Sequence, residues 1–242
     1  MSQLLSGKVA LVTGAGKGIG HATALLLAAH GATVVGTARS EADLQKLLDE
    51  IIASGGQGLV LSGDLTSEEF VGQLFQLVED RCGRLDILIN NAGIGAFAPV
   101  AEMPVATLRH CLEVNVVAAF HCMQRAIGLM RARGDGKIIN VGSVRSHWSE
   151  GGDSGAYNAS KFALRAITES VARELHGSGA RISVGMVCPG IVDTTLTNPG
   201  GDSQPDWLQP ETVAAAILHA VSAPDGVNVF DTVLFPTAQR PW

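Results

Sequence analysis

The sequence predicts an α/β fold in which a doubly wound parallel sheet of seven strands, in the order 3-2-1-4-5-6-7, is covered by helices on both faces. Three observations lead to it. Short apolar stretches alternate with helical stretches along the whole chain, and a glycine-rich turn joins the first predicted strand to the first predicted helix. No repeat, low-complexity tract or linker divides the chain, so we expect residues 1–242 to form a single domain.

The composition favours a protein that acts on small molecules. The 242 residues are 46% hydrophobic, and 17 basic against 23 acidic residues give a formal net charge of −6 without any basic block. These charges argue against nucleic acid or an anionic membrane as a partner. The longest apolar run is too short to span a bilayer, and the first strand starts too early to leave room for a signal peptide, so we expect a cytoplasmic protein.

No metal or disulfide pattern is found in the sequence. The histidines do not cluster, and His110 and His121 are interpreted as surface or interface residues. The cysteines show no paired spacing and are expected to be reduced thiols: Cys82, Cys111, Cys122 and Cys188.

The first strand and helix enclose the glycine-rich turn. An apolar run, Lys8–Val12, is followed by Thr13-Gly14-Ala15-Gly16-Lys17-Gly18-Ile19-Gly20 and by a helix over Ala22–Ala29. In a Rossmann-type fold, glycines here let the main chain approach a pyrophosphate, and the free N–H groups of the helix N-terminus face its charge. A plain turn needs fewer glycines, so this one predicts a dinucleotide site.

The end of the second predicted strand, Thr33–Thr37, indicates which dinucleotide binds. An acidic residue there would bond the ribose 2′-hydroxyl of NAD, whereas a basic residue accommodates the 2′-phosphate of NADP. The chain has Ala38 and Arg39, and Lys17 adds a second positive charge on the same side. Either cation alone is also explained as a solvated surface charge, but the two together favour NADP(H).

The remaining elements continue the alternation of strands and helices. Strands are predicted over Leu59–Gly63, Asp86–Asn90, Lys137–Val141, Arg181–Val187 and Val227–Leu234, before a tail, Phe235–Trp242. Helices are predicted over Glu41–Ala53, Ser67–Asp80, Val105–Arg131, Ala156–His176 and Glu211–Val221. Parallel sheets bind ligands beyond the carboxyl ends of their strands, where the chain carries Asp64-Leu65, Asn90-Asn91-Ala92-Gly93 and Gly142-Ser143.

The helix over Val105–Arg131 is apolar on more than one side. A polar residue, Asn115, falls inside its main apolar stripe and needs a partner. The opposite side is also apolar, which is more than one sheet can bury and predicts a subunit contact; it carries Val114, Val117, Ala118 and Cys122.

The helix over Ala156–His176 opens with Tyr157 and Lys161. Residues four apart lie one turn apart on one face, so the ammonium can favour the ionised phenol and make a proton carrier. Tyr157 is the only tyrosine of the chain. The spacing alone is a weak signal, because exposed Tyr–Lys pairs are common on helices.

Beyond this helix, residues 191–210 are rich in Gly, Pro, Asp and Asn and are predicted to form a substrate lid.

These motifs, taken in order, resemble those of the short-chain dehydrogenase/reductase family over nearly the whole chain. The similarity is carried by Thr13-Gly14-x-x-x-Gly18-x-Gly20, Asp64, Asn90-Asn91-Ala92-Gly93, Asn115, Ser143, Tyr157-x-x-x-Lys161, and Pro189-Gly190 with Thr194. The tail Pro236-Thr237-Ala238-Gln239 resembles a branch of NADP-dependent hydroxy-acid and small-carbonyl dehydrogenases. The resemblance also implies a homo-oligomer, a dimer or a homotetramer.

The resemblance implies a role for each matching residue. Tyr157 donates a proton to the substrate oxygen, Ser143 holds that oxygen, Lys161 supports the ionised phenol and bonds the nicotinamide ribose, and Asn115 positions a relay water. The cofactor is expected on Gly14, Lys17, Gly18, Ile19 and Gly20 for the pyrophosphate side, Arg39 for the 2′-phosphate, Asp64 and Leu65 for adenine, Asn90, Ala92 and Gly93 for the adenosine ribose, and Pro189, Ile191 and Thr194 for the nicotinamide.

The substrate is left open between two classes. Arg145 and His147, beside Ser143, are candidates to bind a carboxylate, as in a 3-hydroxy-acid dehydrogenase, although both are equally well explained as solvated loop residues. Phe97, Trp148 and Trp207 favour a pocket for an apolar ketone or aldehyde. A non-catalytic NADP-binding regulatory protein is the alternative of another kind, which the complete catalytic set disfavours.

Overall fold

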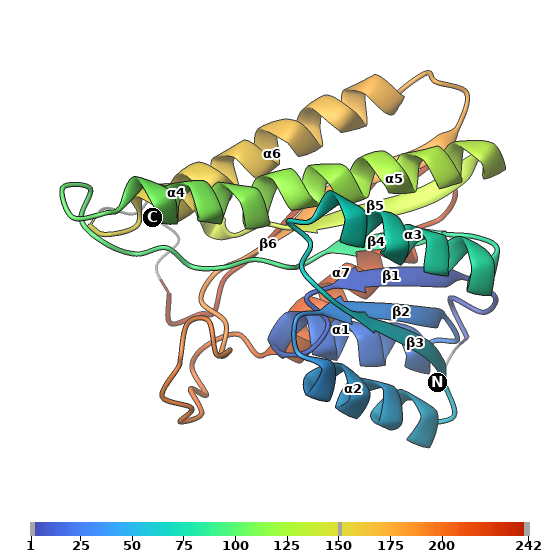
Figure 1. Cartoon of the computed structure of the whole chain (residues 1–242), viewed down its shortest axis with the longest axis horizontal. Helices are drawn as coiled ribbons and strands as arrows, with labels where there is room; N and C mark the ends of the chain where they lie inside the picture. Colours follow the sequence, from blue (N-terminus) through green and yellow to red (C-terminus); the bar gives the residue numbers. More distant parts are fainter. Residues whose placement is uncertain (1–2, 150–151, 240–242) are drawn as a thin grey trace.

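The computed structural model describes residues 3–149 and 152–239, so the end of the predicted tail, residues 240–242, lies outside the described part. Its strands form one seven-stranded parallel sheet in the order β3-β2-β1-β4-β5-β6-β7. Figure 1 shows α1, α2 and α7 on one face of this sheet and α3, α5 and α6 on the other. The predicted fold class and strand order are confirmed.

The elements keep the predicted order along the chain. The strands are β1 (Val9–Thr13), β2 (Thr33–Ala38), β3 (Gln57–Ser62), β4 (Ile87–Asn90), β5 (Asp135–Val141), β6 (Arg181–Pro189) and β7 (Asp231–Leu234). The helices are α1 (Gly18–Ala29), α2 (Glu41–Ala53), α3 (Glu68–Cys82), α4 (Val105–Leu112), α5 (Ala118–Arg133), α6 (Gly155–Leu175) and α7 (Pro210–Val221). Two short helical turns, η1 (Glu113–Val117) and η2 (Val144–Ser146), complete the set.

Each face of the sheet has its own core, because alternate residues of a strand point to opposite faces. On β1, Ala10 and Val12 pack against α1, α2 and α7, whereas Val9 and Leu11 pack against α3, α5 and α6. The central strands are buried on both sides, as a parallel sheet between two helical layers requires. Because the residues of the central strands are buried in the two cores, the side chains that can form a site are those that follow the strands.

The predicted helix over Val105–Arg131 is interrupted. The segment Glu113–Val117 is a π-helix between α4 and α5, and Asn115 lies in its middle. The Asn115 amide oxygen accepts from Ile94 N–H at 2.8 Å and its nitrogen donates to Ile94 O at 3.0 Å. A π turn moves one residue out of helical register, and here that residue bonds the chain after β4, a long-range contact that periodicity does not reveal.

The last strand is shorter than the predicted Val227–Leu234. Ahead of Asp231, Asn228 bonds the neighbouring β6 through its side chain, with Nδ2 donating to Val184 O at 3.0 Å. Met186 N donates to Phe230 O at 2.7 Å, a main-chain bond of the parallel ladder. Regular pairing begins only at Met186 opposite Asp231.

Smaller differences concern element ends and the loop after β5. The first helix begins at Gly18 rather than Ala22, inside the glycine-rich turn, and β3 begins at Gln57 rather than Leu59. The loop after β5 contains the one-turn helix η2. Among the described residues, no helix is both long and apolar enough to cross a membrane.

Candidate active site

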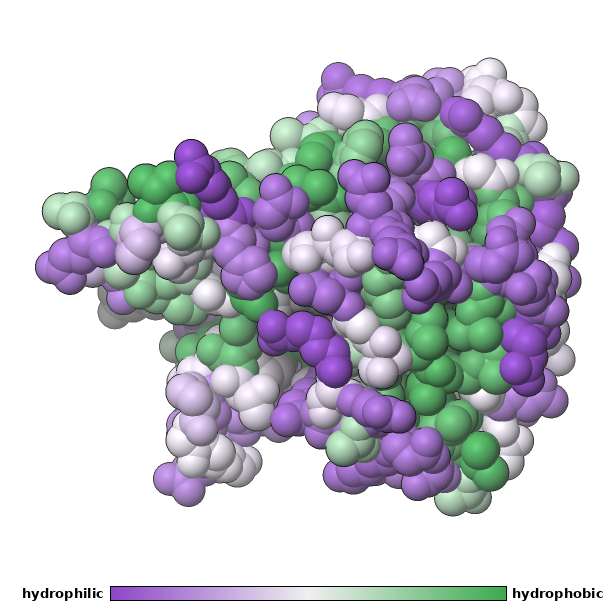
Figure 2. Space-filling view, in the orientation of Figure 1, coloured by the Kyte–Doolittle hydropathy of each residue, from purple (hydrophilic) through white to green (hydrophobic). Residues whose placement is uncertain are grey.

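A cavity of about 460 Å³ opens at the carboxyl ends of the strands. It runs from the glycine-rich turn and the end of β2 to the start of α6 and the segment after β6. Figure 2 shows the surface hollowed on this side of the molecule, between the projecting end near α4 and the segment after β6. The cavity lies where a doubly wound sheet binds its ligand, and its lining includes fourteen of the predicted site residues: Gly14, Lys17, Gly18, Ile19, Arg39, Asp64, Leu65, Ala92, Gly93, Ser143, Tyr157, Lys161, Pro189 and Thr194.

The glycine-rich turn presents bare main chain to the cavity. Gly14 and Gly18 adopt positive φ angles of 64° and 55°, which favour glycine. A Cβ on Gly20 would collide with the main-chain oxygen of Gly14, so Gly20 serves the close packing of the turn and does not line the cavity. The α1 N-terminus has no side-chain cap and no acidic residue in its first turn. Its free N–H groups and dipole therefore suit an anion such as a pyrophosphate.

The end of β2 adds positive charge beside the turn. Arg39 lines the cavity, and no ion pair of its guanidinium is found within residues 3–149 and 152–239. Lys17 also lines it, but its ammonium lies 3.2 Å from the Asp43 carboxylate. The side chain of Ser40 accepts from Asp43 N and caps α2. Of these two cations, Lys17 is held in an ion pair, whereas Arg39 has none with the described residues.

Asp64 lies on the same side of the cavity, beyond β3. Its Oδ1 accepts from the Thr66 N–H and hydroxyl, both at 2.9 Å. These two bonds, with smaller contributions from Arg39 and His110, hold the pKa of Asp64 below its ordinary value. The carboxylate is therefore charged at neutral pH and rigidly placed.

The turn after β4 is fixed to the glycine-rich turn. Thr13 Oγ1 accepts from the N–H groups of Asn91 and Ala92, both at 3.0 Å, and Asn91 Nδ2 donates to Thr13 O at 3.0 Å. The side chain of Asn90 points the other way. It is buried and donates to Ala119 O and Asn140 Oδ1, so Asn90 holds the sheet to its helices rather than lining the expected ribose site.

Ser143 directly follows the end of β5 and begins the turn η2. Its side-chain oxygen accepts from Arg145 N at 3.2 Å, and its N–H donates to Ser146 Oγ at 3.3 Å. A hydroxyl has one hydrogen and two lone pairs. The bond from Arg145 uses one lone pair and leaves the hydroxyl hydrogen available to a ligand oxygen.

Tyr157 and Lys161 lie on the first turns of α6, facing the same cavity. The Lys161 ammonium lies 5.6 Å from the centroid of the Tyr157 ring and donates to Val141 O at 3.0 Å. Lys161 is 6% exposed, so its charge acts on the phenol with little screening by water. The phenol itself stays reachable from the cavity.

Asn115 reaches this group through Ser160. Its amide nitrogen donates to Ser160 Oγ at 3.0 Å, beside Lys161, as well as to Ile94 O. The residue is 1% exposed. The amide is therefore bonded to protein atoms, and it connects η1 to α6 and to the chain after β4.

The segment after β6 forms the remaining wall. Its two ends are joined by a bridge between Val192 and Leu208, both buried in the core. Ile191 does not line the cavity; its N–H donates to Gln239 Oε1 at 2.8 Å. Gln239 therefore fixes the turn that begins this wall, a role that the sequence analysis missed although it singled out the Pro236–Gln239 stretch.

The five predicted substrate residues do not line the cavity. Phe97 lies nearest, with its ring 5.4 Å from that of Tyr157. Arg145 donates to Asn158 Oδ1, and His147 contacts Arg165 and Asp231. The remaining two are tryptophans: Trp148 packs between His147 and Phe235, and Trp207 belongs to the wall segment.

One cavity residue was interpreted differently from the sequence. His110, predicted to be a surface or interface residue, lines the cavity together with Val114, one helical turn further along. Five residues span about 140° around an α-helix, so its spacing from Asn115 gave no signal for this position.

Comparison with known proteins gives matches over most of the chain. A family model described as short chain dehydrogenase matches residues 8–204. A dehydrogenase/reductase SDR family member 11 from Gallus gallus is 34% identical over 250 residues, covering 97% of this chain and 98% of the relative. An uncharacterized oxidoreductase of Staphylococcus aureus (strain MW2) is 33% identical over 233 residues, covering 96% and 99%.

Solved structures also match nearly the whole chain. A metagenomic short-chain oxidoreductase in complex with NADP is 31% identical with a TM-score of 0.85, covering 98% of this chain and 100% of that chain. An alcohol dehydrogenase from the archaeon Thermococcus sibiricus, complexed with 5-hydroxy-NADP, is 28% identical with a TM-score of 0.88, covering 97% and 99%.

Proposed function

Because the chain belongs to the short-chain dehydrogenase/reductase family of NAD(P)-dependent oxidoreductases, we propose that it is an NADPH-dependent reductase that converts a ketone or aldehyde reversibly to an alcohol. The observation that carries the proposal is that Ser143, Tyr157 and Lys161 line the same cavity as the glycine-rich turn. The proposed cofactor site and the acid–base groups that hydride transfer requires therefore border the same cavity.

Each group has one task in this proposal. The cofactor, when bound, supplies or accepts the hydride. Tyr157 donates its hydroxyl proton to the substrate oxygen, and Ser143 donates a hydrogen bond to the same oxygen as negative charge develops there. Lys161 stabilises the phenolate that remains, and Asn115 holds the start of α6 and the turn after β4 in place.

The proposed cofactor site uses the bare main chain of Gly14 and Gly18 and the open N-terminus of α1 for the pyrophosphate. Arg39 binds the 2′-phosphate, and Asp64 and Leu65 border the adenine. The NADP in the related metagenomic oxidoreductase supports this choice of cofactor.

We expect Arg39→Asp to reverse the cofactor preference. A charge-assisted hydrogen bond contributes about 1.5–3 kcal/mol, so kcat/KM for NADPH should fall by roughly 10- to 100-fold. The value for NADH should stay the same or rise, because an acid can bond a 2′-hydroxyl. Steady-state kinetics with both cofactors measure this. Arg173→Asp, an exposed charge reversal on α6, is the matched control, and an equal loss with both cofactors would remove Arg39 from the phosphate site.

The proposed substrates are uncharged. A carboxylate would need a cation near Tyr157 besides Lys161, whose charge is assigned to the phenol, and Arg145 and His147 are bonded elsewhere. The surroundings of Tyr157 are apolar, with the Phe97 ring beside it and Ile94, Val114 and Leu196 in the cavity wall. These contacts support an apolar or aromatic carbonyl compound over a 3-keto acid.

A carbonyl panel tests the proposed function. NADPH consumption, with NADH in parallel, is measured over short semialdehyde acids, β-keto esters, aryl ketones and diketones. We expect turnover of the uncharged members. Turnover confined to the acids would favour the hydroxy-acid alternative, and tight NADPH binding without turnover of any member would favour the non-catalytic one.

We also propose a homo-oligomer, a dimer or tetramer, and a lid made by residues 191–210. The assembly is supported by large apolar side chains exposed on α6 and at the start of α5: Val117, Phe120 and Phe162. The lid is supported by Thr194 to Thr197, which line the cavity while the ends of the segment are fixed. Sedimentation velocity measures the assembly, and loss of protease protection without cofactor reports the lid.

A further inference from the structure

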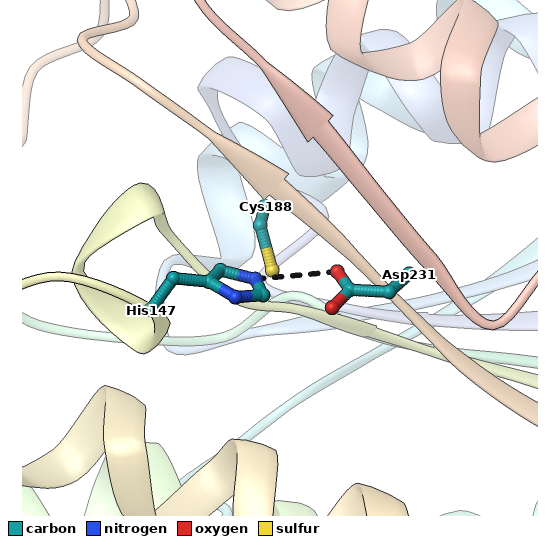
Figure 3. A group of neighbouring side chains, drawn as sticks. All are labelled: His147, Cys188 and Asp231. Carbon is teal, nitrogen blue, oxygen red and sulfur yellow. Dashed lines mark ion pairs between the residues drawn. The ribbon is translucent and has the colours of Figure 1, made fainter. Parts of the chain in front are cut away.

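His147 is contacted from two other elements of the fold. It follows η2, four residues after Ser143, and its side chain is 10% exposed. Its Nδ1 lies 2.7 Å from Nη1 of Arg165 on α6, and its Nε2 lies 3.3 Å from Oδ1 of Asp231 on β7. Figure 3 shows the ring and the Asp231 carboxylate facing each other, with Cys188 beside them. One imidazole thus joins the Ser143 turn, the helix of the catalytic tyrosine, and the last strand.

The neighbours of this imidazole decide where its proton is. A guanidinium only donates hydrogen bonds, so Nδ1 must be the accepting, unprotonated nitrogen. The proton of the ring is then on Nε2, facing the Asp231 carboxylate. That contact does not have hydrogen-bond geometry, so Asp231 holds the proton by charge attraction. Arg165 and Asp231 together select the neutral ring protonated at Nε2.

The same geometry disfavours a metal ion at this place. The ligand atoms of His147, Cys188 and Asp231 lie within 4.8 Å of one another, and such a set suits Zn²⁺. An imidazole bound to a metal through Nε2 carries its proton on Nδ1 and donates it to an acceptor. Here Nδ1 faces the donor Arg165. Burial, with the charge of Asp231, also raises the pKa of Cys188 to about 12, which keeps the sulfur protonated.

We propose that His147 is a positioning residue for Ser143. The neutral imidazole ties the turn η2 to α6 through Arg165 and to β7 through Asp231, and so sets the place of the serine hydroxyl relative to Tyr157. The hydrogen bonds of Ser143 to Arg145 and Ser146 stay within its own turn, and its N–H also contacts the Cys188 thiol on β6. These contacts do not reach α6. Two side chains link the turn to α6: Arg145, which donates to Asn158, and His147, which contacts Arg165 and also joins the turn to β7. The inference rests on the proposed function, in which Ser143 and Tyr157 share one substrate oxygen.

A double-mutant cycle measures how much the contact between His147 and Arg165 contributes to kcat. The variants are His147→Leu, Arg165→Leu and the two combined, assayed with a substrate identified by the carbonyl panel. A displacement of about 1 Å at a reacting group costs up to 100-fold, so each single variant should lose roughly 10- to 100-fold in kcat with an unchanged KM for NADPH. The double variant should lose less than the product of the two single losses, because each single change already removes the shared His147–Arg165 contact. His147→Leu also removes the Asp231 contact, and Arg165→Leu the ion pair with Glu169. Losses that multiply, or an unchanged kcat, would overturn the proposal.

A conservative variant and a matched control separate positioning from general damage. His147→Asn places an amide oxygen near the position of Nδ1, so it keeps an acceptor for Arg165 and should recover much of the kcat lost in His147→Leu. Arg173→Leu removes the same charge from an exposed site two turns further along α6 and should leave kcat unchanged. An Asn variant as poor as the Leu variant would show that the Arg165 contact does not matter.

The ring itself is observed by solid-state NMR of the intact protein carrying ¹³C,¹⁵N-labelled histidine, with His147→Asn identifying the signals. At neutral pH we expect Nδ1 unprotonated and Nε2 protonated, and no change on adding Zn²⁺. A ring protonated at Nδ1, a doubly protonated ring or a Zn²⁺-induced shift would each overturn the proposal. This readout needs no turnover, so failure of the proposed function and failure of the tie are distinguished.

Discussion

Replacing Tyr157 with phenylalanine is expected to lower kcat by roughly 10²- to 10⁴-fold, the range of a positioned proton donor. The substitution removes only the hydroxyl. The ring contact with Phe97, at 5.4 Å between centroids, and the packing of Lys161 over the ring remain possible. The loss should therefore appear in kcat, measured by NADPH consumption under saturating substrate, with little change in thermal stability.

Cofactor affinity is the control for this variant. Fluorescence titration with NADPH should give a dissociation constant close to that of the unmodified protein, since the residues proposed to bind the pyrophosphate and the 2′-phosphate are on the glycine-rich turn and at the end of β2, away from Tyr157. Activity within about tenfold of the original would assign the proton transfer to another group. Because the chain has a single tyrosine, no other phenol can substitute.

Replacing Ser143 with alanine should have the second largest effect, a loss of roughly 10²- to 10³-fold in kcat, as found when a donor to a developing oxyanion is removed. The hydroxyl accepts from Arg145 N within its own turn, which leaves its hydrogen available to donate to the substrate oxygen. The change should again fall on kcat rather than on the KM for NADPH.

The matched variants for Ser143 are a threonine at the same place and an alanine elsewhere. Ser143→Thr keeps a hydroxyl and should retain more activity than Ser143→Ala. Ser170→Ala removes an exposed serine of α6 whose hydroxyl bonds its own helix at Ala166 O, and it should be silent. If Ser143→Ala kept the kcat of the unmodified protein, the hydroxyl would have no role in the reaction.

The order of elements was predictable because the signals for it are local. Apolar runs of strand length, helical spacing, and the turn Gly14 to Gly20 are properties of neighbouring residues, and they specify the parallel sheet that the structure confirms. The boundaries that shifted depend on contacts far along the chain. The π-helix at Asn115 forms because its amide bonds Ile94, and β7 is shorter than predicted because Asn228 bonds β6 through its side chain.

The same distinction between local signals and long-range contacts applies to the residues of the site. Residues at strand ends or one helical turn apart, such as Ser143 and the Tyr157–Lys161 pair, are brought to one cavity as expected from topology. The direction of a side chain in a loop depends on distant partners. Arg145 and His147 follow Ser143 closely in sequence, yet Asn158, Arg165 and Asp231 draw them away from the cavity.

The bridge between Val192 and Leu208 has a consequence for how this protein can diversify. The two residues anchor the wall segment to the core, and between them Asp193 binds Asn198 and the N–H of Gln204, so the loop is braced from within. Between these anchors the sequence can vary, or be replaced by that of a relative, provided that the anchors and Thr194, which faces the glycine-rich turn, are matched. Substrate preference can then change while most of the proposed cofactor site, which lies outside the segment, stays the same.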